Sequence, residues 1–560
     1  MDALRGLAEL RRRRAAPFVL ELDLTQPMLE ERPTDPVGRW QSRRRPVLPD
    51  VLQALHDAAT DPRVCGLIAK VGARRLGFAQ VQDVRSAVAA FRAAGKPTVA
   101  WSETFGELSV ATVPYYLAAA FDEIWLQPSG ELGLVGVSAG SLFLAEALDK
   151  VGVRRQFGTR HEYKSAANIF LERSFTGPQR EATSRIVDSL FEQVVTGIAG
   201  GRGLDDRVVR ELIDRAPLLA QEAHDAKLVD HLGYRDEVYA GTLSKNDPEP
   251  QLLFAHRYRR RQPLVRRLGR VVRRRREVVA LVTGVGTIRL GRSAHGPVLA
   301  GAMGSDTVSA ALRAAGKDDR VKAVVFRVNS PGGSYVASDV IWREVKRLRD
   351  AGKPVVVSMG DVAGSGGYFI SAPADVIVAE PGTFTGSIGV IGGKLSFADL
   401  LSQLGIRHDE VSDGRHARMM SVLDEYSEEE YQQLSGWLDR IYDDFVGKVA
   451  AGRSMTVEAV HEVARGRVWT GADARDRGLV DELGDVQHAA GVARRRSGLP
   501  ADAELVRYPP QPVGPRLRPP RSSEDPFAAA AALDPWGPLT GLAARLGWPS
   551  AGPLVMPPVP

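Results

Sequence analysis

The sequence of 560 residues contains a single cysteine, Cys65. One chain therefore cannot form an internal disulfide or a cysteine-based metal site, and its fold does not depend on an oxidising compartment. Long apolar runs are also missing near the start, where Pro17 interrupts a short stretch at 15–20. A membrane-spanning helix needs about 20 apolar residues and a signal peptide about 7–15 with a cleavage site. We therefore expect a cytoplasmic protein.

Arginine is abundant and unevenly distributed. The formal net charge is +6, and eleven arginines fall within 257–276. The apolar residues of this run have helical spacing: Leu264, Val265, Leu268, Val271 and Val272. A helix with this apolar face and arginines between would suit contact with anionic lipid headgroups. The sequence thus favours a solvated basic linker, with peripheral contact at the inner face of the membrane as the alternative. Nucleic-acid binding is not favoured, because no aromatic-rich platform accompanies the arginines.

Segments of the first half recur in the second half in the same order. "DPRVCGLIAKV" at 61–71 matches "DDRVKAVVFRV" at 318–328, and "YYLAAAFDEIWLQPSGELGLVGV" at 115–137 matches "YFISAPADVIVAEPGTFTGSIGV" at 368–390. In each copy, short runs of β-branched residues alternate with segments whose apolar residues have helical spacing. This pattern is typical of β-α units around a parallel sheet. Two tandem copies of one α/β fold explain this self-similarity.

The repeat and the composition together define five predicted regions. These are a basic N-terminal segment (1–16), an N-terminal repeat (17–250), an Arg-rich linker (251–276), a C-terminal repeat (277–508) and a Pro-rich tail (509–560). The tail holds fourteen of the 35 prolines, so we expect it to be largely disordered.

Only the second copy has glycine pairs after two of its strands. They lie in "RVNSPGGS" at 327–334 and in "GDVAGSGGYF" at 360–369. Glycine lets backbone N–H groups point at a ligand with no side chain in the way. Ser365 lies in the second loop, at the expected start of a helix, and faces Thr112 of the first copy. Two such loops around one serine indicate acyl transfer.

A nucleophilic serine needs a base and an oxyanion site. The N–H groups of Gly332 and Gly333 are the predicted oxyanion donors, each donor contributing roughly 3–4 kcal/mol. The nearest downstream histidines, His408 and His416, lie in no recognisable motif. Lysine is the alternative base for Ser365.

The motifs "RVNSPGGS", "GDVAGSGGYFISAPADVIVAEPGTFTGSIGV" and "HEYKSAANIF" resemble the long, duplicated form of signal peptide peptidase A, in serine peptidase family S49. The resemblance implies that Ser365 is the nucleophile, that Lys164 is its base and that Ser387 holds the lysine. It also implies a ClpP/crotonase-like fold, a homo-tetramer and short apolar peptide substrates such as cleaved signal peptides. It implies no cofactor and no metal.

The internal repeat supports the lysine assignment. Depending on the gap, the counterpart of Lys164 in the second copy is Arg418 or Met420. The first copy would then supply the base and the second copy the nucleophile. A neutral lysine at pH 7 costs about 4.6 kcal/mol relative to the charged form in water, so we expect Lys164 to be buried with Ser365 and Ser387 as partners.

Two functions other than proteolysis are compatible with parts of the sequence. A crotonase-like acyl-CoA hydratase or isomerase would use carboxylates for proton transfer, and Asp361 and Asp339 are the candidates near the glycine loops. A non-catalytic membrane-associated scaffold is the second alternative. Neither accounts for Ser365 together with Lys164.

Overall fold

The computed structural model describes residues 17–31, 45–72, 76–244, 250–258, 276–293, 301–509 and 554–556. These residues form two compact units. Unit 1 contains the described residues within 17–137 and 190–276, and unit 2 contains those within 138–189 and 277–560. Each unit is built around one parallel sheet.

Unit 1 has a six-stranded sheet in the order β8-β4-β3-β2-β1-β9, and all its neighbouring strands are parallel. Its strands are β1 (Phe18–Asp23), β2 (Val64–Lys70), β3 (Thr98–Ser102), β4 (Glu123–Leu126), β8 (His231–Leu232) and β9 (Gln251–Phe254). The helices that follow its strands are α3 (Leu48–Ala59), α4 (Phe78–Ala93), α5 (Thr112–Ala118), residues 190–202 of α8 (Gly177–Arg202), α9 (Asp206–Arg215), α10 (Ala220–Asp225), α11 (Arg235–Leu243) and α12 (Ala255–Tyr258); residues 177–189 of α8 belong to unit 2. A short antiparallel pair, β5 (Glu131–Leu132) with β7 (Leu218–Leu219), completes this unit.

Unit 2 repeats this strand order. Its sheet contains β20-β16-β15-β13-β10-β21, all parallel, with β17 and β19 added beside the end of β15. Its strands are β10 (Val278–Val285), β13 (Val321–Ser330), β15 (Val355–Gly364), β16 (Val376–Ala379), β17 (Phe384–Gly386), β19 (Val468–Thr470), β20 (Glu482–Leu483) and β21 (Leu505–Arg507). The central strands are rich in valine and almost wholly buried, as expected for a sheet covered on both faces.

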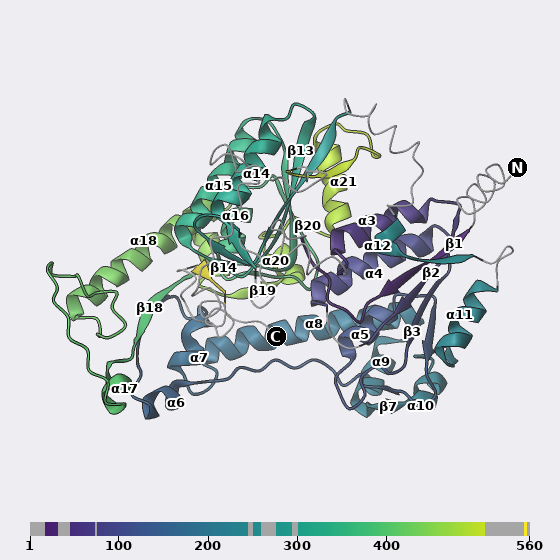
Figure 1. The fold of residues 1–560 in the computed structure, drawn as a ribbon, viewed down its shortest axis with the longest axis horizontal. Helices are drawn as coiled ribbons and strands as arrows, with labels where there is room; N and C mark the ends of the chain where they lie inside the picture. Colours follow the sequence, from purple (N-terminus) through teal and green to yellow (C-terminus); the bar gives the residue numbers. More distant parts are fainter. Residues whose placement is uncertain are drawn as a thin grey trace, which may run out of the picture. The chain divides into compact units, whose positions relative to one another are not determined.

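Helices cover both faces of the unit 2 sheet. In Figure 1, α14, α15 and α16 lie on one side of β13 and α21 lies on the other. The helices of this unit are α6 (Ala145–Lys150), α7 (Asn168–Leu171), α14 (Ser305–Lys317), α15 (Tyr335–Asp350), α16 (Gly366–Ser371), α17 (Ala398–Gln403), α18 (Glu428–Arg453), α19 (Val457–Val463), α20 (Gly471–Asp476) and α21 (Val486–Arg496). Several of these helices begin after a residue whose side chain caps the helix. Ser334 caps α15, and Ser427 forms a capping box with Glu430 at the start of α18.

Two smaller sheets complete unit 2. One has the order β12-β11-β14-β22, with β11 (Thr287–Arg289), β12 (Ala302–Gly304), β14 (Gly332–Gly333) and β22 (Leu554–Val555). The other pairs β6 (Arg154–Arg160) antiparallel with β18 (Val390–Ser396).

Equivalent hydrogen bonds recur in the two units. The buried Tyr115 hydroxyl donates to the Leu228 carbonyl at 2.6 Å in unit 1. At the matching positions of unit 2, the Tyr368 hydroxyl donates to the Leu479 carbonyl at 2.9 Å. The α/β class and the tandem duplication predicted from the sequence are therefore confirmed, since strand order and individual contacts repeat together.

The boundaries of the units differ from the predicted ranges at two places. Residues 138–189, within the predicted repeat 17–250, pack with unit 2. The start of the predicted linker 251–276 forms β9 and α12, because β9 pairs with β1 and the Tyr258 hydroxyl donates to Asp61 at 2.8 Å. The predicted basic segment 1–16, the arginine run from 259 to 275 and most of the tail 509–560 lie outside the described residues.

Within the residues that the structure describes, no helix is long and apolar enough to cross a membrane.

The matched tyrosines provide a test of the repeated core. We expect Tyr368→Phe to lower the free energy of unfolding by about 1–3 kcal/mol, because the buried Leu479 carbonyl loses its donor. Tyr115→Phe should have a similar effect on unit 1. Urea unfolding followed by tryptophan fluorescence measures both, with the exposed Tyr234→Phe as control. Wild-type stability in the two buried variants would contradict this account.

Candidate active site

Ser365 stands at a sharp strand-to-helix turn in unit 2. β15 ends at Gly364 and α16 begins at Gly366, and Ser365 between them has φ 52° and ψ −116°. A positive φ costs a non-glycine residue on the order of 1–3 kcal/mol. The Ser365 amide donates to the Gly386 carbonyl at 2.8 Å, and its carbonyl accepts from Phe369 at 2.9 Å. These bonds hold the turn and fix the position of the hydroxyl.

The two glycine loops predicted from the sequence lie against one another. A Cβ on Gly366 would come within 3.1 Å of the Gly332 Cα, and a Cβ on Gly367 within 2.6 Å of the Ser330 carbonyl oxygen. Both glycines of the serine loop are therefore required for the close approach of the two backbones. The approach places Gly332 and Gly333 directly beside the turn that carries Ser365.

The amides of these loops have different partners. The Gly332 N–H donates to the Ser330 hydroxyl at 3.1 Å. Gly333, with φ 153°, lies with its nitrogen beside Gly366. The Gly366 amide is the first of α16, and the first amides of a helix have no intrahelical acceptor. Sequence reasoning did not single out Gly366, although its place directly after the serine was the available signal.

Lys164 is brought to Ser365 from a distant part of the chain. Its side chain is 1% exposed, and its Nζ lies 2.9 Å from the Ser365 Oγ. The same nitrogen lies 3.0 Å from both the carbonyl oxygen and the hydroxyl oxygen of Ser387. The three residues named from the sequence thus form one buried cluster within unit 2.

Burial controls the protonation of the lysine. Removal of the amine from water lowers the pKa of Lys164 well below its ordinary value of 10.5. Desolvation penalises the charged ammonium, and no carboxylate partners the amine among its hydrogen bonds in the described structure. The site therefore favours the neutral amine, which is the form that can accept a proton.

Strand pairing and one glycine position the lysine. β6 and β18 pair so that Arg160, shortly before Lys164, lies opposite Val390, shortly after Ser387. Gly466 (φ 85°) fits against Lys164 so closely that a Cβ there would come within 2.5 Å of the Lys164 Cβ and backbone nitrogen. Its N–H donates to the Ile388 carbonyl at 2.8 Å. Gly466 therefore joins the lysine segment to the strand end that carries Ser387.

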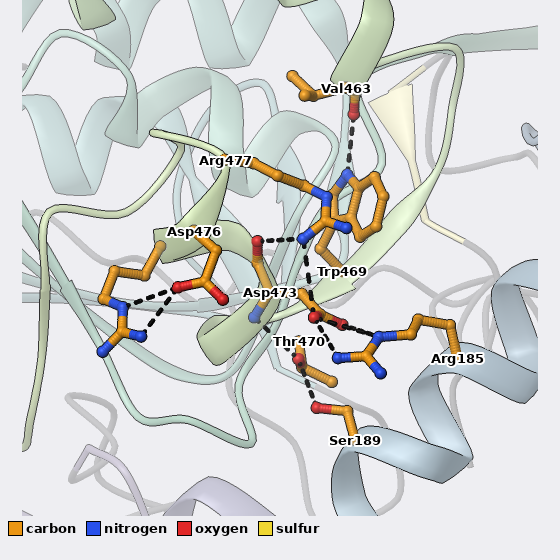
Figure 2. A network of polar contacts seen from close by, with 9 residues as sticks. Arg185, Ser189, Val463, Trp469, Thr470, Asp473, Asp476 and Arg477 are labelled. Atoms are coloured by element: carbon orange, nitrogen blue, oxygen red, sulfur yellow. Dashed lines mark hydrogen bonds and ion pairs between the residues drawn. The ribbon is translucent and has the colours of Figure 1, made fainter.

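A polar network joins the first part of α8 to the sheet of unit 2 (Figure 2). The Arg185 guanidinium pairs with the Asp473 carboxylate at 2.7 Å, and the hydroxyls of Ser189 and Thr470 lie 2.9 Å apart. Thr470 ends β19, which pairs with β17, and Ser387 directly follows β17. The segment that carries Lys164 is thus attached to the same strands that carry its partners.

A small cavity of about 60 Å³ lies beside the lysine segment. Tyr163 and Ser165, the neighbours of Lys164 in the chain, form part of its wall together with Phe175, Ile169 and Ile186. Ser141, Gln179 and Thr183 also line the cavity, so its wall is of mixed polar and apolar character.

The alternative proton-transfer residues have other partners. His408 lies 3.9 Å from Glu410, and His416 lies 3.1 Å from Gln433. Asp339, proposed for acyl-CoA chemistry, is paired with Lys448 at 2.5 Å. None of these contacts involves the serine or the lysine of the cluster.

Comparison with known proteins gives a consistent result. Residues 90–246 and 347–499 match Peptidase family S49. Protease 4 of Salmonella typhi is 33% identical over 460 residues, covering 79% of this chain and 71% of that protein. A chloroplastic serine protease SPPA of Arabidopsis thaliana is 29% identical over 463 residues, covering 82% of this chain and 67% of that protein. A putative signal peptide peptidase SppA of Enterococcus faecium is 38% identical over 192 residues, covering 34% of this chain and 56% of that protein.

The buried serine at its strand-to-helix turn, the glycine loop against it and these relatives define a serine protease. The residues that match the family lie in both copies of the repeat. The chain belongs to peptidase family S49, as a long, duplicated member of the signal peptide peptidase A type.

The role of Gly466 can be tested with a matched glycine. We expect Gly466→Ala to lower kcat/KM for peptide hydrolysis at least about 100-fold, because the added Cβ displaces the Lys164 backbone and small misplacements of catalytic groups are costly. Gly405→Ala is the control, since Gly405 also has a positive φ (74°) but nothing within 4 Å of its Cβ position. Equal activity of the two variants would contradict this role.

The buried amine also predicts a pH-dependent stability difference. Between pH 10.5 and the lower folded-state pKa, the unfolded chain binds a proton at Lys164 that the folded chain does not. The stability of the wild type therefore falls as pH falls through this window, with a slope of up to about 1.4 kcal/mol per pH unit. We expect Lys164→Met to be the more stable protein, by a margin that grows from pH 10 to pH 7 in urea unfolding. A margin that does not change with pH would exclude a depressed pKa.

Proposed function

We propose that this serine protease uses Ser365 as its nucleophile and Lys164 as its general base. The observation that carries the proposal is the 2.9 Å separation of Nζ and Oγ at a site from which water is excluded. A serine hydroxyl needs an adjacent base to become nucleophilic, and a lysine serves when desolvation keeps it neutral.

Proton positions around the amine fit this role. A neutral lysine amine has two N–H donors and one lone pair. The two N–H groups donate to the carbonyl and the hydroxyl of Ser387. The lone pair is then directed at Ser365 and accepts its O–H. In this proposal Ser387 orients the base, and the Arg467 carbonyl, which accepts from the Ser387 amide at 2.7 Å, holds Ser387 in turn.

The reaction then proceeds in two halves. Lys164 takes the hydroxyl proton as the Ser365 Oγ attacks the peptide carbonyl, and the carbonyl oxygen becomes an oxyanion. We assign the oxyanion site to the Gly332–Gly333 loop together with the first amide of α16, on Gly366. The protonated lysine gives its proton to the leaving amine as the C–N bond breaks. Water, deprotonated by the same lysine, hydrolyses the acyl-enzyme and releases Ser365.

The proposed substrates are short apolar peptides, such as cleaved signal peptides, bound in an extended conformation. In this proposal the peptide pairs with β14, beside Ser365, along the edge that pairs with β22 in the described structure. The cavity beside the lysine segment, with Phe175, Ile169 and Ile186 in its wall, is the proposed site for a small apolar side chain of the substrate. The name of the Enterococcus faecium relative, a putative signal peptide peptidase, agrees with this class of substrate.

We further propose a homo-tetramer that contacts anionic membranes peripherally through 257–276, at the cytoplasmic face. The eleven arginines of this run and the helical spacing of its apolar residues support the membrane contact. The family resemblance supports the tetramer.

Hydrolysis of a fluorogenic apolar peptide tests the dyad. We expect Ser365→Ala and Lys164→Met each to lower kcat at least about 1,000-fold, because neither group acts without the other. Lys394→Met is the matched control: Lys394 is a largely buried lysine whose amine donates to the Met419 carbonyl, so its loss should leave kcat within about threefold. Full activity of Ser365→Ala would reject the serine mechanism.

A further inference from the structure

The Trp469 side chain in β19 packs on the backbone that holds the nucleophile turn. A Cβ on Gly386 would come within 2.9 Å of the Trp469 ring. The Gly386 carbonyl accepts the Ser365 amide at 2.8 Å, and Ser387 follows Gly386 directly in the chain. The indole N–H donates to the Val463 carbonyl at 2.8 Å, as Figure 2 shows, and this bond holds the ring in place. The indole therefore supports the backbone around both serines of the cluster.

A carboxylate bridge lies on the lysine side of the cluster. Tyr163 directly precedes Lys164, and its hydroxyl donates to Oε2 of Glu181 at 2.9 Å. The other carboxylate oxygen, Oε1, accepts from the Arg467 guanidinium at 2.6 Å. The hydrogen bond from Tyr163 and the pairing with Arg467 lower the pKa of Glu181 below its ordinary value of 4.5. Glu181 is therefore ionised at neutral pH and binds one partner with each oxygen.

The Arg467 side chain joins the carboxylate bridge to the indole. The central carbon of its guanidinium lies 4.9 Å from the centre of the Tyr163 ring and 4.3 Å from the centre of the Trp469 ring. A guanidinium can contact aromatic rings while its N–H groups pair with a carboxylate. The Arg467 side chain is 16% exposed. One largely buried side chain thus contacts both the neighbour of the proposed base and the support of the proposed nucleophile.

The lysine depends on such contacts because it lies in no regular element. Lys164 falls between the end of β6 and the short helical segment 165–167. Catalytic groups have to be held within about 0.5 Å of their productive positions by the residues around them. The Glu181 carboxylate is 56% exposed, and exposed ion pairs contribute little to folding. The pair of Glu181 with Arg467 is therefore better suited to fixing local geometry than to stabilising the fold.

We propose that Arg467 is a positioning residue of the proposed dyad: it holds Tyr163 against Trp469 and so fixes the lysine relative to the serine. The proposal rests on the proposed function of the Ser365 site. Arg467 acts through Lys164 and through the backbone behind the serine, not on the reacting atoms. Loss of its guanidinium removes the link between the two sides, so the lysine segment moves away from β19 and water reaches the amine.

Hydrolysis of a fluorogenic apolar peptide gives the first test. We expect Arg467→Met to lower kcat/KM about 10-fold to 100-fold, because a small displacement of a catalytic group is costly. Arg313→Met is the control: Arg313 of α14 pairs with Glu344 of α15 at 2.9 Å and is 24% exposed, so its loss should leave kcat/KM within about twofold. Equal activity of Arg467→Met and wild type would overturn the proposal.

The pH profile separates positioning from a general loss of structure. In the proposed mechanism kcat/KM rises with pH as Lys164 loses its proton, and burial sets the pKa of Lys164 well below 10.5. Water that reaches the amine raises this pKa toward 10.5. We therefore expect the midpoint of the acid limb to move to higher pH in Arg467→Met and to stay in place in Arg313→Met. An unmoved midpoint, with activity lowered equally at every pH, would reject the positioning role.

Glu181→Gln tests the bridge from its exposed side, where a substitution places little demand on the fold. Glutamine keeps an oxygen for the Tyr163 hydroxyl but loses the charge that pairs with Arg467. We expect kcat/KM to fall about threefold to tenfold. The double variant with Arg467→Met should be no less active than Arg467→Met alone, because the two side chains act as one unit. Losses that multiply in the double variant would overturn the bridge.

A measurement without hydrolysis distinguishes failure of this proposal from failure of the dyad. In urea unfolding, the stability margin of Lys164→Met over its parent is measured at pH 10 and pH 7, once in the wild-type chain and once in the Arg467→Met chain. We expect the margin to grow less in the Arg467→Met chain, because the amine of a more hydrated lysine has a pKa closer to 10.5. Equal growth in the two chains would overturn the positioning role. If Ser365→Ala remains fully active while the margin still depends on Arg467, the dyad mechanism fails and the positioning of Lys164 remains.

Discussion

A lysine amine held away from water, between two serine side chains, is the interaction on which the proposed chemistry of this molecule depends. In water the charged form of the amine is favoured by several kcal/mol at neutral pH. Burial here lowers the pKa of Lys164 well below its ordinary value, and Ser387 offers an acceptor for each N–H group of a neutral amine. In the proposed mechanism the lone pair is left for Ser365. An exposed lysine at the same distance would carry a proton and could not act as a base, so the enclosure of the cluster matters as much as its geometry.

Close approaches of the backbone form part of that enclosure. Ser365 has a positive φ, and its loop meets the Gly332–Gly333 loop through positions where a Cβ would clash. Gly466 does the same on the lysine side. Such close approaches are possible only where glycine stands, and each is held by amide-to-carbonyl hydrogen bonds from neighbouring strand ends. The strain of the serine turn is therefore maintained by the parallel sheet on which it stands.

The duplication explains why one copy alone is insufficient. The two units repeat a strand order and individual tyrosine hydrogen bonds, yet only the second copy has the glycine loops. The lysine comes from residues 138–189, which lie between β5 and β8 in the chain and pack with unit 2, where β6 pairs with β18 and Arg185 pairs with Asp473. In the proposed mechanism this segment of the first copy completes the site of the second copy.

The sequence by itself determined the repeat, the alternating β-α pattern and the two glycine loops around Ser365, while Lys164 and Ser387 were assigned from the family resemblance of their motifs. Those features are local: they follow from periodicity, from glycine pairs and from motifs a few residues long. Only the tertiary structure decided that 138–189 packs with unit 2, that Gly466 supports the lysine, that the Gly332 amide already has an acceptor in Ser330 and that Met556 lies on Gly364. Apart from the Gly332–Ser330 hydrogen bond, these contacts join residues that are far apart in the sequence. Burial and close backbone approach depend on what surrounds a residue in space, and no short stretch of sequence contains that information.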